Sequence, residues 1–77
     1  MTRKSKVIDR FLKNPTSVRY EELAKVLEHY GFLAIAAKGS HIKFKHTRLT
    51  TDLIIPVHNG DCKDFYKKLA LKLIISL

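Results

Sequence analysis

The sequence has few cysteines, no long apolar run and a short chain, and each of these excludes a class of protein. Its 77 residues contain one cysteine, Cys62, which has no partner for an internal disulfide or for a C-x-x-C metal pair. No apolar run approaches the ~20 residues of a membrane span, and no signal-peptide core follows the polar start. A chain of this length buries only ~60% of its unfolded surface, which excludes a second domain and an enclosed substrate cavity. We therefore expect one small soluble domain in a reducing compartment, the cytoplasm.

Positive charge is what the sequence has in excess. Fifteen Lys and Arg residues against seven Asp and Glu residues give a net charge of +8, spread from Arg3 to Lys72 without one dominant block. Because the apolar content of 45% is ordinary for a globular domain, the charge belongs to a folded surface. Such a surface attracts polyanions, of which nucleic acid is the commonest, and charge that only maintains solubility is the alternative.

Hydrophobic periodicity predicts three helices. A short helix is expected over Ser5–Lys13, where Asn14-Pro15 ends it, and a second over Arg19–Tyr30, where Gly31 takes the left-handed position. A last helix is expected from a cap at Asp61 to the end of the chain. The predicted apolar face of the second helix comprises Tyr20, Leu23, Ala24, Leu27 and Tyr30. That of the last helix comprises Phe65, Tyr66, Leu69, Ala70, Leu73 and Ile74, which leaves Lys63, Lys67, Lys68 and Lys72 in solvent.

Three strands are expected between the second and last helices. They cover Phe32–Ala37, His41–His46 and Asp52–Val57, and the connections at 38–40 and 47–51 are short enough for antiparallel hairpins. Side chains alternate along a strand, so Ile42 and Phe44 face the core while His41, Lys43 and Lys45 make the other face basic.

The order of these elements predicts an α+β fold. A three-stranded antiparallel sheet would be covered by helices on one face and open on the other, in the order α-β-β-β-α after a short N-terminal helix. Residues 1–77 are expected to form a single domain, with residues 1–16 as an N-terminal helix or extension and residues 17–77 as the core.

Four histidines are the side chains that titrate near neutral pH without help, so acid–base chemistry would use them. His41 follows Gly39-Ser40 on the lysine side of the middle strand, where glycine admits a phosphate and an imidazole can move a proton, although Gly-Ser is also an ordinary turn. His58 is the second candidate, exposed on the same open face. His29 is expected to be idle at a helix end, and His46 half-buried and hydrogen-bonded.

Other chemistries are disfavoured by spacing. No two histidines have metal-pair spacing with a supporting carboxylate, so no metal site is expected. Cys62 stands in the first turn of a predicted helix, but Asp61 and Asp64 oppose the lowering of its pKa that this position favours. Ser40 and His41 are strand neighbours that point to opposite faces, so they do not form a nucleophile–base pair.

Four stretches together resemble a known family: Tyr20-Glu21-Glu22-Leu23 with Leu27, Tyr30-Gly31-Phe32, Lys38-Gly39-Ser40-His41-Ile42-Lys43-Phe44-Lys45-His46, and Ile55-Pro56-Val57-His58. Over most of the chain they are similar to the HicA family of toxin–antitoxin systems. The resemblance implies a fold like that of double-stranded RNA-binding domains and an mRNA interferase neutralised by a HicB antitoxin. It also implies that His41 is the catalytic histidine. Many members have a second histidine directly after the first, where this chain has Ile42.

With this resemblance, the sequence predicts a type II toxin that cleaves mRNA as a metal-independent endoribonuclease, with His41 as general acid or base and no cofactor. The residues expected to contact RNA are Lys38, Gly39, Ser40, Lys43, Lys45, Lys67 and Lys68. The expected partners are RNA and an acidic HicB-like antitoxin that covers the open sheet face and His41. The alternatives are a non-catalytic module for double-stranded or structured RNA, and a structural or partner-binding protein.

Overall fold

A computed structural model describes residues 3–77, and it contains three α-helices, one 3-10 turn and three strands. In chain order these are α1 (Arg3–Lys13), the turn η1 (Pro15–Ser17), α2 (Tyr20–His29), β1 (Leu33–Ala36), β2 (His41–Lys45), β3 (Leu53–Pro56) and α3 (Asp64–Ile75). The predicted α+β order is confirmed. Each strand is slightly shorter than predicted, and α1 begins before the predicted Ser5.

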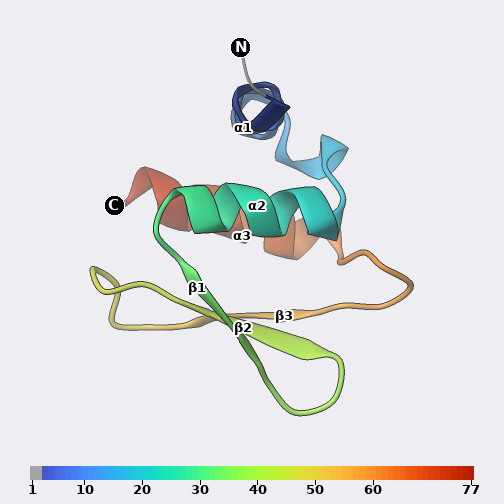
Figure 1. The fold of residues 1–77 in the computed structure, drawn as a ribbon, viewed down its shortest axis with the longest axis vertical. Helices are drawn as coiled ribbons and strands as arrows, with labels where there is room; N and C mark the ends of the chain where they lie inside the picture. Colours follow the sequence, from blue (N-terminus) through green and yellow to red (C-terminus); the bar gives the residue numbers. More distant parts are fainter. Residues whose placement is uncertain (1–2) are drawn as a thin grey trace.

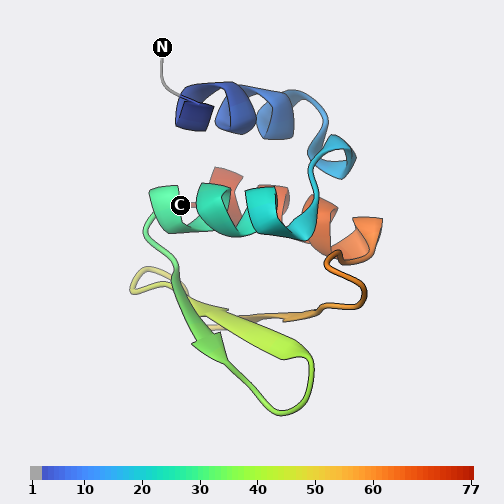
Figure 2. The ribbon, with the colours of Figure 1, turned by 45° about the vertical axis from the view of Figure 1, so that its right-hand side comes forward.

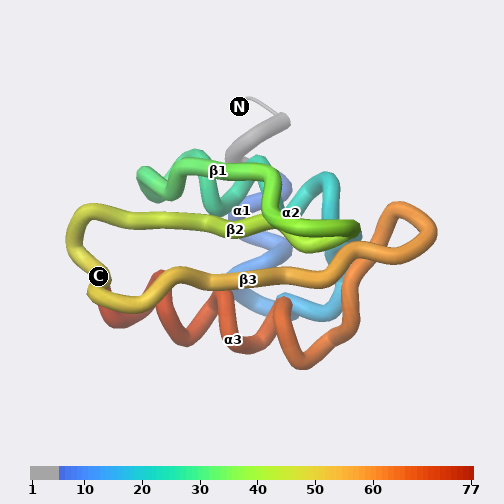
Figure 3. The backbone as a smooth tube through the Cα atoms, turned by 90° about the horizontal axis from the view of Figure 1, so that it is seen from below, coloured from blue at the N-terminus to red at the C-terminus, as the bar shows by residue number. Residues whose placement is uncertain are grey.

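The helices lie on one face of the sheet. Helices α2 and α3 run side by side in the same direction across this face, and α1 packs on α2 at the side away from the strands (Figure 1 and Figure 2). Seen from the other side, the strands lie in front of the helices, and no element of residues 3–77 covers them (Figure 3). The predicted sheet with one covered and one open face is therefore confirmed, and it agrees with the fold of double-stranded RNA-binding domains that the resemblance implies.

The sheet is antiparallel with the strand order β1-β2-β3. Between β2 and β3, Ile42 lies opposite Ile55 and Phe44 opposite Leu53. Phe44 and Ile55 are fully buried and Leu53 is nearly so, which places this side of the two strands against the helices. The register thus confirms the alternation predicted for the middle strand.

The core fills the space between the sheet and α2 and α3, and α1 extends it. Phe11 of α1 is fully buried, and an ion pair between Arg10 and Glu22 joins α1 to α2. Val26, outside the predicted apolar face of α2, is buried because α2 is packed between the sheet and α1. The buried apolar residues are Phe11, Val18, Leu23, Val26, Leu27, Phe32, Phe44, Leu53, Ile55, Ala70 and Ile74.

The end of α2 is fastened to the end of β2 by a histidine. Gly31 has φ +95°, and a Cβ there would lie 3.1 Å from Nε2 of His46. That Nε2 lies 2.9 Å from the carbonyl oxygen of Tyr30, and Nδ1 accepts from the backbone N–H of Arg48 at 3.0 Å. The ring also packs edge-on against Phe32, with centroids 4.9 Å apart. The prediction of a half-buried, hydrogen-bonded His46 is confirmed.

The last helix agrees with its predicted apolar stripe at all but one position. Tyr66, Leu69 and Leu73 pack against the buried core. The buried positions of the helix are Lys67, Ala70 and Ile74, whereas Phe65, predicted in the apolar stripe, is 64% exposed. The prediction of an exposed Lys67 is also wrong, because this side chain is buried. The core-facing side of α3 is therefore the predicted one, with Lys67 added to it and Phe65 left out.

Candidate functional site

His41 is held at the start of β2 with one ring nitrogen engaged. Its side chain is exposed, and Nδ1 lies 3.1 Å from the carbonyl oxygen of Lys38 in the preceding hairpin. A carbonyl oxygen only accepts hydrogen bonds, so Nδ1 carries the proton in this contact. The neutral imidazole is then the tautomer with a lone pair on Nε2, which is the arrangement that a general base requires.

The hairpin between β1 and β2 fixes this end of the strand. Gly39 has φ +70°, which favours glycine, and open space surrounds the position that a Cβ would occupy. The carbonyl oxygen of Ser40 accepts from the backbone N–H of Val57 at 3.1 Å, which ties the hairpin to the end of β3. Lys38, Gly39 and Ser40 are all exposed and directly precede His41, the first residue of β2. The hairpin between β1 and β2 lies at one end of the sheet (Figure 3).

The open face of the sheet is a lysine stripe with apolar edges. Lys43 of β2 lies between Ile35 of β1 and Ile54 of β3, and Lys45 lies opposite Leu33. Leu33, Ile35 and Ile54 are 64%, 39% and 47% exposed. We predicted a basic face and missed its apolar edges, although the uninterrupted apolar run of β3 places one isoleucine on this side.

The lysines near His41 have charges that the protein does not neutralise. Lys38 and Lys45 are exposed and Lys43 is half-buried. Within residues 3–77, none of these three takes part in an ion pair. An anionic ligand on the open face would therefore meet unpaired positive charge around His41.

His58 is exposed as predicted, but not on a strand. β3 ends at Pro56, and His58 stands in a tight turn whose backbone pairs with Asp61 through hydrogen bonds of 2.8 and 3.0 Å. The predicted strand through Val57 is therefore one residue too long. The alternation that would have placed His58 beside His41 stops before it reaches His58.

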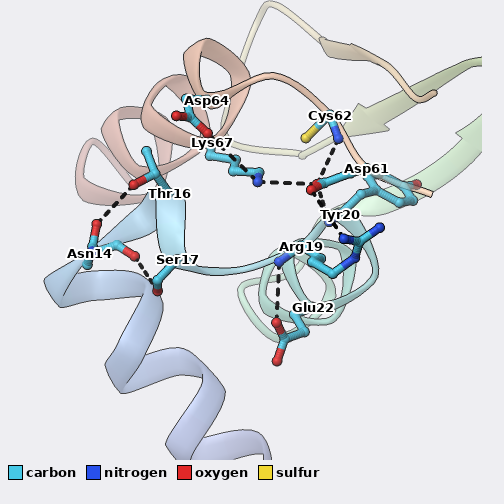
Figure 4. A network of polar contacts seen from close by, with 10 residues as sticks. All are labelled: Asn14, Thr16, Ser17, Arg19, Tyr20, Glu22, Asp61, Cys62, Asp64 and Lys67. Carbon is cyan, nitrogen blue, oxygen red and sulfur yellow. Dashed lines mark hydrogen bonds and ion pairs between the residues drawn. The ribbon is translucent and has the colours of Figure 1, made fainter. Parts of the chain in front are cut away.

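Asp61 organises the loop between β3 and α3 (Figure 4). Its Oδ1 accepts from the backbone N–H groups of Tyr20 at 3.0 Å and Cys62 at 2.8 Å, and lies 3.2 Å from the Lys67 ammonium. Partial burial by itself raises the pKa of Asp61, but the hydrogen bonds from Cys62, Lys67 and Tyr20 outweigh it and lower the pKa below its usual value. The predicted helix cap at Asp61 is wrong, because α3 begins at Asp64 and Asp61 joins α2 to α3 instead.

Lys67 and Lys68, adjacent in sequence, have opposite environments. Lys67 is 4% exposed and its ammonium lies 3.2 Å from Asp61 and 3.9 Å from Asp64, so it is not in position to meet a phosphate. Lys68 is exposed. A buried lysine is stable here because a carboxylate faces it, which the local helical pattern cannot show.

A cavity of about 270 Å³ lies between the end of β3 and the start of α3. Sequence reasoning missed it as a site. Among its walls is the Cys62 thiol, whose pKa burial raises, with Asp61 and Asp64 adding to the increase and Lys67 opposing it. This environment keeps the thiol protonated. The lining residues are Pro56, His58, Asp61, Cys62, Lys63 and Tyr66.

Neither a cluster of metal ligands nor a membrane-spanning helix is found among residues 3–77. Within residues 3–77, no group of three or more His, Cys, Asp and Glu side chains is placed to hold a metal ion. None of the helices in this range has the length and apolar character needed to cross a membrane.

The chain matches a family of known proteins described as "HicA toxin of bacterial toxin-antitoxin" over residues 20–73, more than two thirds of its length. The matched segment begins with α2 and includes the whole sheet, His41 and the cavity residues, whereas α1 and η1 precede it. Neither a curated protein nor a solved structure matches the chain.

Proposed function

This chain belongs to the HicA family of toxins from bacterial toxin–antitoxin systems, and from that membership we propose that it is an endoribonuclease that cleaves mRNA without a metal ion. The observation that supports this most strongly is the state of His41. The contact with the Lys38 carbonyl fixes the tautomer that leaves Nε2 able to accept a proton on an exposed ring. Cleavage of mRNA in the cytoplasm would make the chain toxic.

In the proposed reaction, a phosphodiester of RNA lies on the open sheet face with a 2′-hydroxyl against Nε2 of His41. Nε2 takes the hydroxyl proton while the 2′ oxygen attacks the adjacent phosphorus, and the bond from phosphorus to the 5′ oxygen breaks. A protonated group returns a proton to the leaving oxygen, and His58 is the candidate for it. The products are a 2′,3′-cyclic phosphate and a 5′-hydroxyl end. One positioned proton-transfer group supplies about 10²–10⁴-fold of rate.

The unpaired lysines around His41 supply the electrostatic part of the proposal. Lys38, Lys43 and Lys45 take part in no ion pair within residues 3–77, so their charges are available to the phosphates before and after the scissile bond. Positive groups near the phosphorus also stabilise the additional negative charge of the pentacoordinate transition state. Gly39 and Ser40 leave the backbone of the hairpin accessible to the same phosphates.

The cognate antitoxin of this toxin would be a HicB-like protein that covers the open face. Leu33, Ile35 and Ile54 give that face exposed apolar surface beside its lysine stripe. An acidic partner with apolar side chains would complement both features, and the net charge of +8 would accelerate its association. Covering this face would also cover His41, so the partner would inhibit by occlusion.

The test is cleavage of an end-labelled transcript by the purified chain in EDTA, with mass spectrometry of the new ends. The native chain should produce 2′,3′-cyclic phosphate and 5′-hydroxyl ends. His41→Ala should lose at least about 100-fold in rate and change affinity for the transcript by less than about threefold. His29→Ala is the matched control, because His29 is another exposed histidine, on α2. In cells, induced native chain should arrest growth and deplete mRNA, and His41→Ala should not.

Two results would contradict the proposal. Native rates of cleavage by His41→Ala would remove this residue from the chemistry. A native chain that binds the transcript and leaves it intact would favour the non-catalytic RNA-binding module, in which His41→Ala is almost silent.

A further inference from the structure

An aromatic pair stands at the start of α3, and one of its rings is in solvent. The rings of Phe65 and Tyr66 meet edge to face, with centroids 5.1 Å apart and an angle of 88°. Phe65 is 64% exposed, whereas Tyr66 is half-buried and lines the cavity described above. Because Phe65 contributes little to the core, its exposure is not explained by folding.

The cavity beside this pair adjoins the place where the phosphodiester would react. Pro56, in the cavity wall, lies directly opposite His41 in the register of β2 and β3. Side chains of directly opposed residues on one sheet face have Cβ atoms about 5 Å apart. The cavity volume of about 270 Å³ lies just below the ~300–1,000 Å³ typical of small-molecule pockets, which suits a single ring system.

The charges around the cavity suit a group attached to a phosphate backbone. Lys63 lines the cavity and is exposed. The carboxylate in the wall, Asp61, is occupied by two backbone N–H groups and by the Lys67 ammonium. The site therefore combines aromatic surface, a compact cavity and accessible positive charge.

We propose that this cavity, together with the ring of Phe65, binds an unpaired nucleobase of the RNA next to the phosphodiester at His41; this inference rests on the proposed function. Every base has an aromatic face that stacks on protein rings, so the combination is typical of sites for single-stranded RNA. Bases inside a duplex are already stacked and paired and do not enter such a site. The substrate class is therefore single-stranded or locally unpaired RNA, although the fold resembles that of domains for double-stranded RNA.

The experiment measures binding of the full chain to a labelled 2′-O-methyl RNA of about ten nucleotides by fluorescence anisotropy. This probe has no 2′-hydroxyl and is not cleaved by the proposed reaction. Phe65→Ala should weaken binding about tenfold, because one base loses its stacking partner. Its salt dependence should be unchanged, since no charge is removed. Binding to a duplex of about 16 base pairs should change less than twofold.

Matched variants separate stacking from general damage. Phe65→Tyr keeps an aromatic ring and should bind within about twofold of the native chain. Ile75→Ala removes a 71% exposed apolar side chain from the far end of the same helix and should have no effect. Cys62→Leu enlarges a wall residue of the cavity and should weaken single-strand binding about tenfold, whereas Cys62→Ser keeps the size and should not.

Two outcomes would overturn the inference. Unchanged single-strand binding by Phe65→Ala and Cys62→Leu would show that no base occupies the cavity. A side chain of a partner protein would then be the alternative occupant. Equal losses for single strand and duplex would show that the site does not distinguish unpaired bases. Cleavage of an ordinary transcript, measured in parallel, tests the proposed function separately: the inference fails alone if His41-dependent cleavage persists, and the proposed function fails alone if stacking is found without cleavage.

Discussion

The two ends of strand β2 carry histidines in opposite situations. At its first residue, His41 is exposed and has one ring nitrogen in contact with the Lys38 carbonyl. Just after its last residue, His46 is half-buried and has both ring nitrogens in hydrogen bonds, one to Tyr30 and one from Arg48. An imidazole needs a nitrogen with an accessible lone pair to act as a base, so only the first histidine retains this capacity.

The comparison shows that residue type does not decide what a histidine does. The end of β2 near His46 lies against the end of α2, where Gly31 leaves room for the ring, and there the imidazole acts as a structural clasp. The end near His41 faces a hairpin and the open sheet face, where the neighbours are lysines and solvent. The His41 end is therefore the one that we propose to be reactive, and the loop beside it is held by Asp61.

The largest expected effect is that substitution of His41 lowers the cleavage rate, whereas substitution of His46 lowers the stability of the fold. His41→Ala should lose at least about 100-fold in cleavage rate and change the free energy of unfolding by less than about 0.5 kcal/mol. His46→Ala should lower that free energy by about 2 kcal/mol, because the Tyr30 carbonyl and the Arg48 N–H lose their partner. Its cleavage rate per folded molecule should stay within about threefold. Urea unfolding and RNA cleavage measure the two quantities, and a stability loss in both variants would erase the distinction.

The same substitution at two glycines tests how tightly the His46 imidazole packs against the end of α2. Gly31→Ala should lower the free energy of unfolding by about 2–4 kcal/mol, because φ is +95° and the new Cβ would lie 3.1 Å from Nε2 of His46. Gly39→Ala has a positive φ but open space around it, so only the backbone strain remains, about 1 kcal/mol. Thermal unfolding of both variants provides the measurement. Equal destabilisation would mean that the contact with the imidazole contributes nothing.

Substitutions of two adjacent lysines test how much the ion pair between Lys67 and Asp61 stabilises the loop before α3. Lys67→Met should lower the free energy of unfolding by about 1–3 kcal/mol, because Asp61 loses a charged hydrogen-bond partner at 3.2 Å. Lys68→Met removes an exposed charge and should change it by less than about 0.5 kcal/mol. Both substitutions keep a long apolar stem, so chemical unfolding compares only the charges. A larger effect at Lys68 would contradict the burial difference between the two side chains.

The smallest expected effect is the pH dependence of that loop. The pKa of Asp61 is lowered in the folded chain, so the ionised carboxylate stabilises the fold above its unfolded pKa of ~3.9. This stability is lost as the pH falls through the lower, folded-state pKa. Urea unfolding from pH 7 to pH 3 should therefore show a decline that begins near pH 4–5. Asp61→Asn should flatten part of it, and an unchanged slope in that variant would assign the decline to other carboxylates.

Much of the fold follows from local patterns in the sequence. The periodic apolar residues of α2, Gly31 after it and the alternation in β2 all predicted elements that the structure contains. These signals are local, because helical and strand periodicity depend on residues within a few positions of one another. His41 was identified in the same way, from its place after Gly39-Ser40, although its catalytic role stays a prediction.

Long-range contacts decided the rest. The sequence alone determined a basic α+β domain with an exposed histidine beside lysines. Only the tertiary structure placed Asp61 against Lys67, which allowed a lysine to be buried, and only it showed that Phe65 lies in solvent. It also decided which nitrogen of His41 is engaged and formed the cavity next to Pro56. The physical reason is that burial, tautomers and cavities depend on which residues distant in sequence meet in space, and a local period contains no such information.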